Sequence, residues 1–181
     1  MINFKANYVS PTYIKDTYRN SDKSDCKVSL VEVDPSSQAD ISAVHDIALN
    51  WGKRDTYAVN IMENLFYSHY CEDFSGKRFF ALTKQPNNFE KLEEEDILGL
   101  AMVITNDAKE VRLEYLQVEP ENNYFSIDRR YKGIGSSLLH SICDIFKNRD
   151  ISLCSAKSAI EFYKSQGFKQ INETMHFILK R

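Results

Sequence analysis

The chain has 181 residues, of which 43% are hydrophobic and 27% are charged, and its formal net charge is −3. These values are typical of a globular protein with one domain, residues 1–181, and they exclude a fibrous or intrinsically disordered chain. The slightly acidic balance disfavours broad binding to nucleic acid or to anionic membranes.

The chain shows no sign of export. Its first residues, MINFKANYVSPTYIKD, lack an apolar core behind a basic start, so they predict no signal peptide. No stretch approaches the roughly 20 apolar residues that cross a bilayer. The four cysteines, Cys26, Cys71, Cys143 and Cys154, have no CxxC spacing, so we expect reduced, buried thiols and no metal site. A cytoplasmic protein is expected.

Hydrophobic periodicity predicts two strands and two helices in the first half. The first 25 residues are polar and weakly patterned, and they predict either an extra hairpin or a loosely docked arm. Ser36 and Ser37 offer an N-cap for the first helix, and Gly52 a C-cap. In chain order we expect a strand at 26–33, a helix ending near Trp51, a helix at 58–69 and a strand at 78–83.

The segment 84–96 is polar and ends in the acidic run 93–96, which is either a solvated loop or an attractor for a cationic substrate. The second half again alternates between strand and helix patterns. We expect strands at 97–105 and 111–118, a helix from Ile134, a strand at 151–154, a helix ending near Gly167 and a strand at 175–179. This order predicts helices packed on both faces of a mixed sheet.

The most informative segment, RRYKGIGS at 129–136, lies between a strand and a helix. Gly133 and Gly135 leave the backbone open to a polyanion, and the first turn of a helix carries unpaired N–H groups and partial positive charge. Neighbouring basic side chains add full charges, so the segment predicts a pyrophosphate cradle. A tight glycine turn before a helix is the alternative. The dinucleotide fingerprint GxGxxG fails at Leu138, and no Walker A loop is present.

The motif RxxGxG, followed by FYxxxGF, resembles the GCN5-related N-acetyltransferase (GNAT) superfamily. The resemblance rests on ILGLAMVIT, VRLEYLQVEP, RRYKGIGSSLL, ISLCS and AIEFYKSQGF, which lie within 97–168, about 40% of the chain. It implies an α/β, three-layer, single-domain fold whose central mixed sheet is largely antiparallel and has helices on both faces. It also implies an acetyl-CoA site within 97–168 and no metal.

The resemblance further implies how acetyl-CoA binds. Backbone amides from Arg130 through Ser136 would hold the pyrophosphate, and the main chain of 116–118 would pair with the pantetheine arm like an added strand. An amide near Leu116 would serve as the oxyanion donor. The implied cofactor-binding residues are Leu116, Gln117, Val118, Arg129, Arg130, Tyr131, Lys132, Gly133, Ile134, Gly135 and Ser136.

Two residues are catalytic candidates. Tyr163 matches the family tyrosine that protonates the departing CoA thiolate, although it also falls on the apolar stripe of its helix and so suits plain packing. Glu114 is the leading general base, because strict alternation puts it on the face of Leu116 and Val118, where burial would raise its pKa. A bulge would re-aim it. Binding of the substrate ammonium and a structural role are the alternatives for Glu114.

The other candidates are weaker. Glu119 sits at a strand exit before Pro120, His140 and His176 have no supporting partner, and Cys154 has no neighbouring base that would make it a nucleophile. The sequence departs from the family by the octapeptide 121–128, ENNYFSID, before the glycine loop. Its Tyr124 and Phe125 suit a substrate rim, a small interface or simple loop anchors.

Together these observations predict a cytoplasmic acetyl-CoA-dependent N-acetyltransferase that acts on a primary amine by direct attack in a ternary complex. A non-catalytic acyl-CoA-binding module is the first alternative. A toxin that acetylates aminoacyl-tRNA is the second, and the acidic charge balance disfavours it. The acceptor amine is not readable from the sequence, nor is whether the protein is a homodimer.

Overall fold

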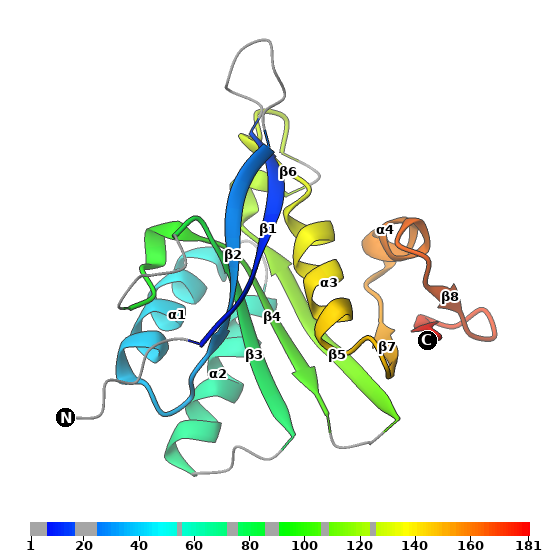
Figure 1. Ribbon diagram of the computed structural model, residues 1–181, viewed down its shortest axis with the longest axis horizontal. Coiled ribbons are helices and arrows are strands. Elements are labelled where there is room, and N and C mark those ends of the chain that lie inside the picture. Colours follow the sequence, from blue (N-terminus) through cyan, green and yellow to red (C-terminus); the bar gives the residue numbers. More distant parts are fainter. Residues whose placement is uncertain are drawn as a thin grey trace.

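The structure, a computed structural model, describes residues 7–16, 25–53, 56–71, 76–85, 91–105, 109–123 and 126–181. One nine-stranded sheet lies between helical layers, which confirms the predicted α/β fold class (Figure 1). The helices are α1 (Gln38–Trp51), α2 (Tyr57–Tyr70), α3 (Ile134–Ile145) and α4 (Ile160–Ser165). The strands are β1 (Asn7–Asp16), β2 (Asp25–Val33), β3 (Lys77–Thr83), β4 (Ile97–Ile104), β5 (Glu110–Val118), β6 (Tyr131–Lys132), β7 (Asp150–Cys154), β8 (Lys169–Gln170) and β9 (His176–Leu179).

The strand order is β6-β1-β2-β3-β4-β5-β7-β9-β8, and every neighbouring pair is antiparallel except β5 and β7. The parallel pair is the one whose connection contains α3, as a crossover between parallel strands requires. The sheet is therefore mixed and largely antiparallel, as predicted. Both strands of the parallel pair run toward the end of the sheet where α3 begins (Figure 1).

Helices α1 and α2 cover one face of the sheet. The predicted Ser37 cap forms, because its Oγ accepts from the Asp40 N–H at 3.3 Å. The Asp34 N–H in turn donates to Asp40 Oδ2 at 3.1 Å. The Asp40 carboxyl is only 1% exposed, and its burial raises its pKa to about 6. The apolar stripe of each helix packs on the β2–β4 part of the sheet, around Phe79 and Leu100.

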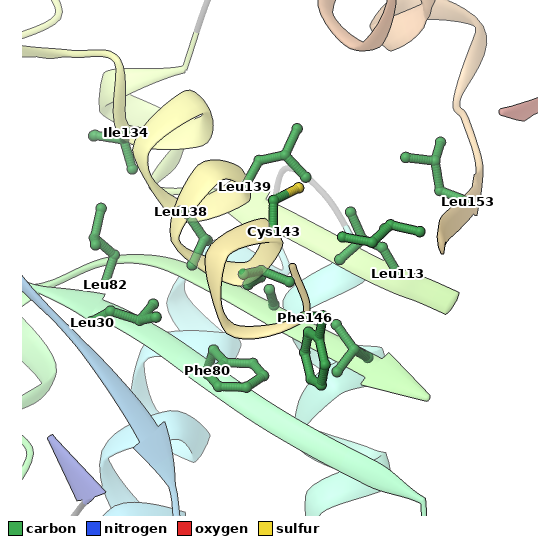
Figure 2. Packing of buried hydrophobic residues seen from close by; sticks show 14 of the residues in the cluster. Leu30, Phe80, Leu82, Leu113, Ile134, Leu138, Leu139, Cys143, Phe146 and Leu153 are labelled. Carbon is green, nitrogen blue, oxygen red and sulfur yellow. The ribbon is translucent and has the colours of Figure 1, made fainter. Parts of the chain in front are cut away.

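Helix α3 covers the opposite face, where it packs on the central strands through an apolar stripe (Figure 2). Leu138 and Leu139 are fully buried there, beside Phe80 and Leu82 of β3. Gly99 of β4 permits this close packing, because a Cβ there would lie 3.2 Å from a Leu138 methyl group. Helix α4 contributes Tyr163 to the same core, so α3 and α4 lie on one face of the sheet.

The N-terminal region adds an edge to the sheet. Strand β1 pairs along β2 with a register shift between Tyr8 and Ser10, and it also pairs with the two-residue strand β6 at its other edge. The predicted hairpin or arm therefore includes a paired strand at 7–16, while residues 1–6 and 17–24 lie outside the described residues. Strands β6 and β8 have no signal in the sequence, since each is two residues long.

Three smaller expectations are resolved. The cysteines are free thiols, but only Cys143 is buried; Cys71 and Cys154 are exposed, so the expectation of four buried thiols is wrong.

The acidic run 93–96 ends in a 3-10 turn. Glu93 is ion-paired with Lys91, and Asp96 is ion-paired with Lys84. Among the described residues, no helix is both long and apolar enough to cross a membrane.

Candidate active site

The predicted anion site is the N-terminus of α3. Gly133 is its N-cap with φ +86°, a left-handed conformation that glycine adopts without strain, and within the described part of the chain no side chain caps the first turn. The first helical hydrogen bond runs from the Ser137 N–H to the Gly133 carbonyl at 2.8 Å, so the N–H groups before Ser137 have no partner within the helix. A Cβ on Gly133 would meet nothing within 4 Å, which leaves this terminus open to an anion.

The two glycines of the motif have different roles. The sequence interpretation gave both the role of opening the backbone to a polyanion. A Cβ on Gly135 would instead lie 3.4 Å from a Val118 methyl group and 3.5 Å from the Phe162 ring, which are ordinary contacts. Gly135 therefore lies where α3, β5 and α4 come together, and only Gly133 combines a positive φ with an open side.

The loop before α3 is fastened at several points. Strand β6 pairs with β1, and Ser137 Oγ donates to the Tyr13 carbonyl at 2.6 Å. The Tyr131 N–H donates to Asn122 Oδ1 at 2.7 Å, and Asn122 Nδ2 donates to the Glu119 carboxylate. The Tyr131 N–H, which was predicted to bind the pyrophosphate, is therefore hydrogen-bonded within the loop. The first part of the insertion, a 3-10 turn at Pro120–Asn122, is what positions the loop.

The basic residues of the motif come just before this terminus in the chain. Arg130 is exposed and its guanidinium lies 4.9 Å from the centre of the Tyr131 ring, while the ring itself is buried. Lys132 is also exposed and Arg129 is half-buried. Ile134 is buried in the α3 core, and Ser136 is half-buried in the first turn of the helix. Three basic residues therefore lie within four positions of Gly133 in the sequence, where the helix terminus carries partial positive charge.

Strand β5 is paired on both sides along only part of its length. On one side it pairs with β4 from Arg112 to Val118. On the other side, within the described residues, its register with β7 covers only 110–113. Residues 114–118 of β5 therefore present main-chain groups toward a gap in the middle of the sheet, beside the start of α3. An extended ligand is suited to pairing with such an edge.

A bulge interrupts β5 at Glu114. Met102 of β4 pairs with Tyr115 and Val103 pairs with Leu113, which leaves Glu114 as the extra residue. Leu113 and Leu116 both face the α3 core, and Tyr115 packs against the α1–α2 core. The expectation that Glu114 shares the face of Leu116 is wrong, because the bulge reverses the alternation. Its carboxylate is ion-paired with Arg112 Nε at 2.6 Å.

Tyr163 lies on α4, the helix that follows β7, and packs in the α3-side core. Its ring contacts three aromatic rings at centroid distances of 5.0 to 6.4 Å, namely those of Phe162, Phe168 and Phe177. The residue is 8% exposed, and burial raises its pKa to about 12, with a smaller contribution from Tyr57. Among the described residues, no hydrogen bond engages the Tyr163 hydroxyl. This group stays protonated at physiological pH.

Sequence reasoning missed the side-chain contacts of three residues, Tyr57, Tyr115 and Gln117, on the opposite face of β5. Tyr57, the first residue of α2, has its ring 6.0 Å from the ring of Tyr115. Gln117 is buried, and its Oε1 accepts from the Ala58 N–H at 2.6 Å. Position 117 was predicted only as a main-chain contact. A buried glutamine between apolar neighbours was the available signal, but its partner comes from a helix 59 residues away in the sequence.

A pocket of about 490 Å³ lies beyond the end of β5. It is lined by Lys84, Glu119, Glu121, Asn122, Asp128, Arg130 and Tyr131. Burial raises the pKa of the Glu119 carboxyl, which is occupied with the Asn122 amide. The residues that line this pocket carry charges of both signs, so the pocket shows no clear preference for a cation or an anion.

Two histidines and a cysteine are the next candidates, and two residues of the insertion lie outside the described residues. His140 is exposed on α3, and His176 is exposed on β9 directly opposite Cys154 of β7. Tyr124 and Phe125 lie outside the described residues, so their three predicted roles remain open.

Comparison with solved structures shows the GNAT fold, and no protein-family model and no curated protein matches the chain. An acetyltransferase from Thermus thermophilus superposes with a TM-score of 0.58 at 13% identity, covering 84% of this chain and 96% of that one. PaiA N-acetyltransferase from Thermoplasma acidophilum in complex with coenzyme A gives 0.51 at 15% identity, covering 83% and 96%. A GNAT-family acetyltransferase from Staphylococcus aureus Mu50 gives 0.53 at 18%, covering 81% and 86%.

Proposed function

We propose that this chain, which has the GNAT fold, is a cytoplasmic enzyme that transfers an acetyl group from acetyl-CoA to a primary amine. The observation that carries the proposal is the uncapped α3 terminus at Gly133 beside the half-paired strand β5. Coenzyme A has a part that suits each of these features. Its pyrophosphate is a polyanion that suits the helix terminus, and its pantetheine arm is an extended chain that suits β5. PaiA, which has the same fold, is in complex with coenzyme A.

Acetyl-CoA fits these residues by charge and by backbone chemistry. The N–H groups of 133–136, together with Arg130 and Lys132, suit the pyrophosphate. The main chain of 116–118 suits the amides of the pantetheine arm, and an N–H near Leu116 suits the thioester oxygen as negative charge develops on it. No metal takes part in this proposal.

The transfer itself needs one base and one acid. The neutral amine attacks the thioester carbonyl, the carbon–sulfur bond breaks, the amine loses a proton and the thiolate gains one. Tyr163 is the proposed acid: its hydroxyl is protonated at neutral pH and lies on the α4 side of the gap. A pKa of about 12 makes it a weak acid, so the thiolate must draw the proton from it as the bond breaks.

Glu114 is the proposed group for the amine. The bulge turns its side chain away from the α3 face, toward the side of β5 where the rings of Tyr57 and Tyr115 lie. Its side chain is ion-paired with Arg112, and its proposed role is either to hold the substrate ammonium or to accept its proton. Glu114→Gln removes the charge but also breaks the ion pair with Arg112, so Arg112→Gln is its control: a merely structural role of the pair predicts the same loss in both variants.

A calorimetric titration with acetyl-CoA tests the proposal first, and a screen of primary amines for release of free CoA tests it second. Saturable 1:1 binding followed by turnover supports it. A folded sample without heat of binding overturns it. Binding without turnover across a broad amine panel identifies instead a non-catalytic acyl-CoA-binding module. Turnover on aminoacyl-tRNA alone identifies the toxin activity. Light scattering of the same sample distinguishes monomer from homodimer.

A further inference from the structure

We infer that the acceptor amine carries a hydrogen-bond-accepting oxygen close to its amino group, and that the Gln117 side-chain amide binds this oxygen. The inference rests on the proposed function and names its substrate class. Amino acids, amino-acid amides, peptide N-termini and amino sugars have such an oxygen. Alkyl polyamines and the lysine side chain present only methylene groups beside the amine.

Gln117 joins the two sides of the active site. Its main chain belongs to the half-paired part of β5, and its side chain crosses to the α1–α2 face. There its Oε1 accepts from the Ala58 N–H in the first turn of α2. Thr56, the N-cap residue of that helix, makes no side-chain capping bond, so Gln117 caps α2 from another element.

This bond fixes the orientation of the carboxamide. Only the oxygen can accept from the Ala58 N–H, so Nε2 occupies the other position of the same planar group. Gln117 is 5% exposed, and Nε2 is fully buried without a hydrogen-bond partner among the described residues. A buried donor without a partner costs about 1–3 kcal/mol. A ligand oxygen can supply the missing acceptor, provided that the side chains covering Nε2 move aside when the ligand binds.

The surroundings place this donor on the acceptor side of the site. The neighbouring residue of α2 is Tyr57, whose ring packs beside that of Tyr115 and whose hydroxyl lies close enough to Tyr163 to influence its pKa. Gln117 and Tyr115 lie on one face of β5, two residues apart. The donor thus lies on the α1–α2 face of β5, where it adjoins the first turn of α2, whose Tyr57 influences the pKa of the proposed acid. The positive end of the α2 dipole also favours an oxygen there.

Two substitutions separate binding from capping. Gln117→Glu keeps an oxygen for the Ala58 N–H and removes the free donor, whereas Gln117→Met removes both at similar size. Each variant is compared with wild type for kcat/KM on L-alaninamide and on isopropylamine, which has a methyl group in place of the carboxamide. We expect wild type to prefer L-alaninamide, and Gln117→Glu to lose about tenfold of that preference, as one neutral hydrogen bond predicts.

The melting temperature and the acetyl-CoA Kd provide the control. Both variants should lower the melting temperature, Gln117→Glu because it buries a carboxylate and Gln117→Met because it removes the cap of α2, so the ratio of the two kcat/KM values reports the lost donor. A wild-type preference for isopropylamine, or a preference unchanged in Gln117→Glu, overturns the inference. If the wild type binds CoA but acetylates neither amine, the proposed function fails separately. The inference is then tested by adding L-alaninamide to the CoA-saturated protein. The amide must raise the melting temperature of wild type and must not raise that of Gln117→Glu.

Discussion

Replacement of Gly133 by alanine is the sharpest test of the α3 terminus. Gly133 has φ +86°, and a left-handed residue with a Cβ costs about 1–2 kcal/mol. The space around the missing Cβ is empty, so this cost is backbone strain without a steric clash. Gly133→Ala should therefore lose about 1–2 kcal/mol of unfolding free energy in urea titration.

The same substitution should weaken coenzyme A binding. Relief of the strain tilts the peptide groups of the first turn of α3, and each N–H bond to a charged phosphate contributes about 1.5–3 kcal/mol. The loss of one such bond raises the Kd by about 10- to 150-fold in isothermal titration calorimetry. Gly133→Asn should fall between wild type and Gly133→Ala in stability, because asparagine enters the left-handed region more readily than alanine.

Gly135→Ala is the matched control from the same motif. Its Cβ makes ordinary contacts with Val118 and Phe162, and alanine is the better helix former. This variant should gain about 0.5–1 kcal/mol and keep its Kd for coenzyme A within a few fold. If Gly133→Ala unfolds at the wild-type urea concentration and binds coenzyme A with the wild-type Kd, the assigned role of the α3 terminus is wrong.

Three further changes test other parts of the structure. Tyr163→Phe keeps the ring contacts and should lower kcat by about 100-fold with the acetyl-CoA KM unchanged; an unchanged kcat removes Tyr163 from the mechanism. Arg130→Glu should raise the Kd for acetyl-CoA by about tenfold at low salt, whereas the same charge reversal at exposed Lys147 should not; equal effects would point to net charge alone. The raised pKa of Asp40, about 6 against an ordinary 3.8, means that the folded state holds the proton more tightly, so stability is greatest at low pH and falls as pH rises through 6. Urea titrations at about pH 4 and pH 7 measure the free energy of unfolding. Between these two pH values wild type should lose up to about 3 kcal/mol more of it than Asp40→Asn, and equal losses would assign the pH dependence to other groups.

Local patterns were sufficient for most of the fold. The α3 stripe that includes Leu138 and Leu139, the Ser37 cap and the strands around Gly99 all follow from signals within one element. Such signals depend on periodicity and caps, which a single segment carries by itself. The resemblance then supplied the arrangement of these elements, and the sheet order agrees with it.

The site was less readable because its decisive features arise between elements. The bulge at Glu114 depends on the register with β4, so alternation within β5 alone assigned the wrong face. Asn122 fixes the Tyr131 amide across the insertion, which looked like an interruption of the family pattern. Gln117 caps a helix that precedes it by many residues. In each case the partner is distant in the sequence, and no spacing rule identifies it.

Binding of acetyl-CoA along the half-paired strand β5, as proposed, would link the supply of this cofactor to the lifetime of the protein. Residues 114–118 leave a seam in the sheet, and a bound cofactor arm would complete the secondary structure there. A ligand that binds only the folded state adds RT ln(1 + [L]/Kd) to its stability, about 2.7 kcal/mol at a hundredfold excess over Kd. Amide protons along the seam would then exchange slowly only while acetyl-CoA is plentiful. A cell short of acetyl-CoA would hold a looser protein, more readily cleared by proteolysis.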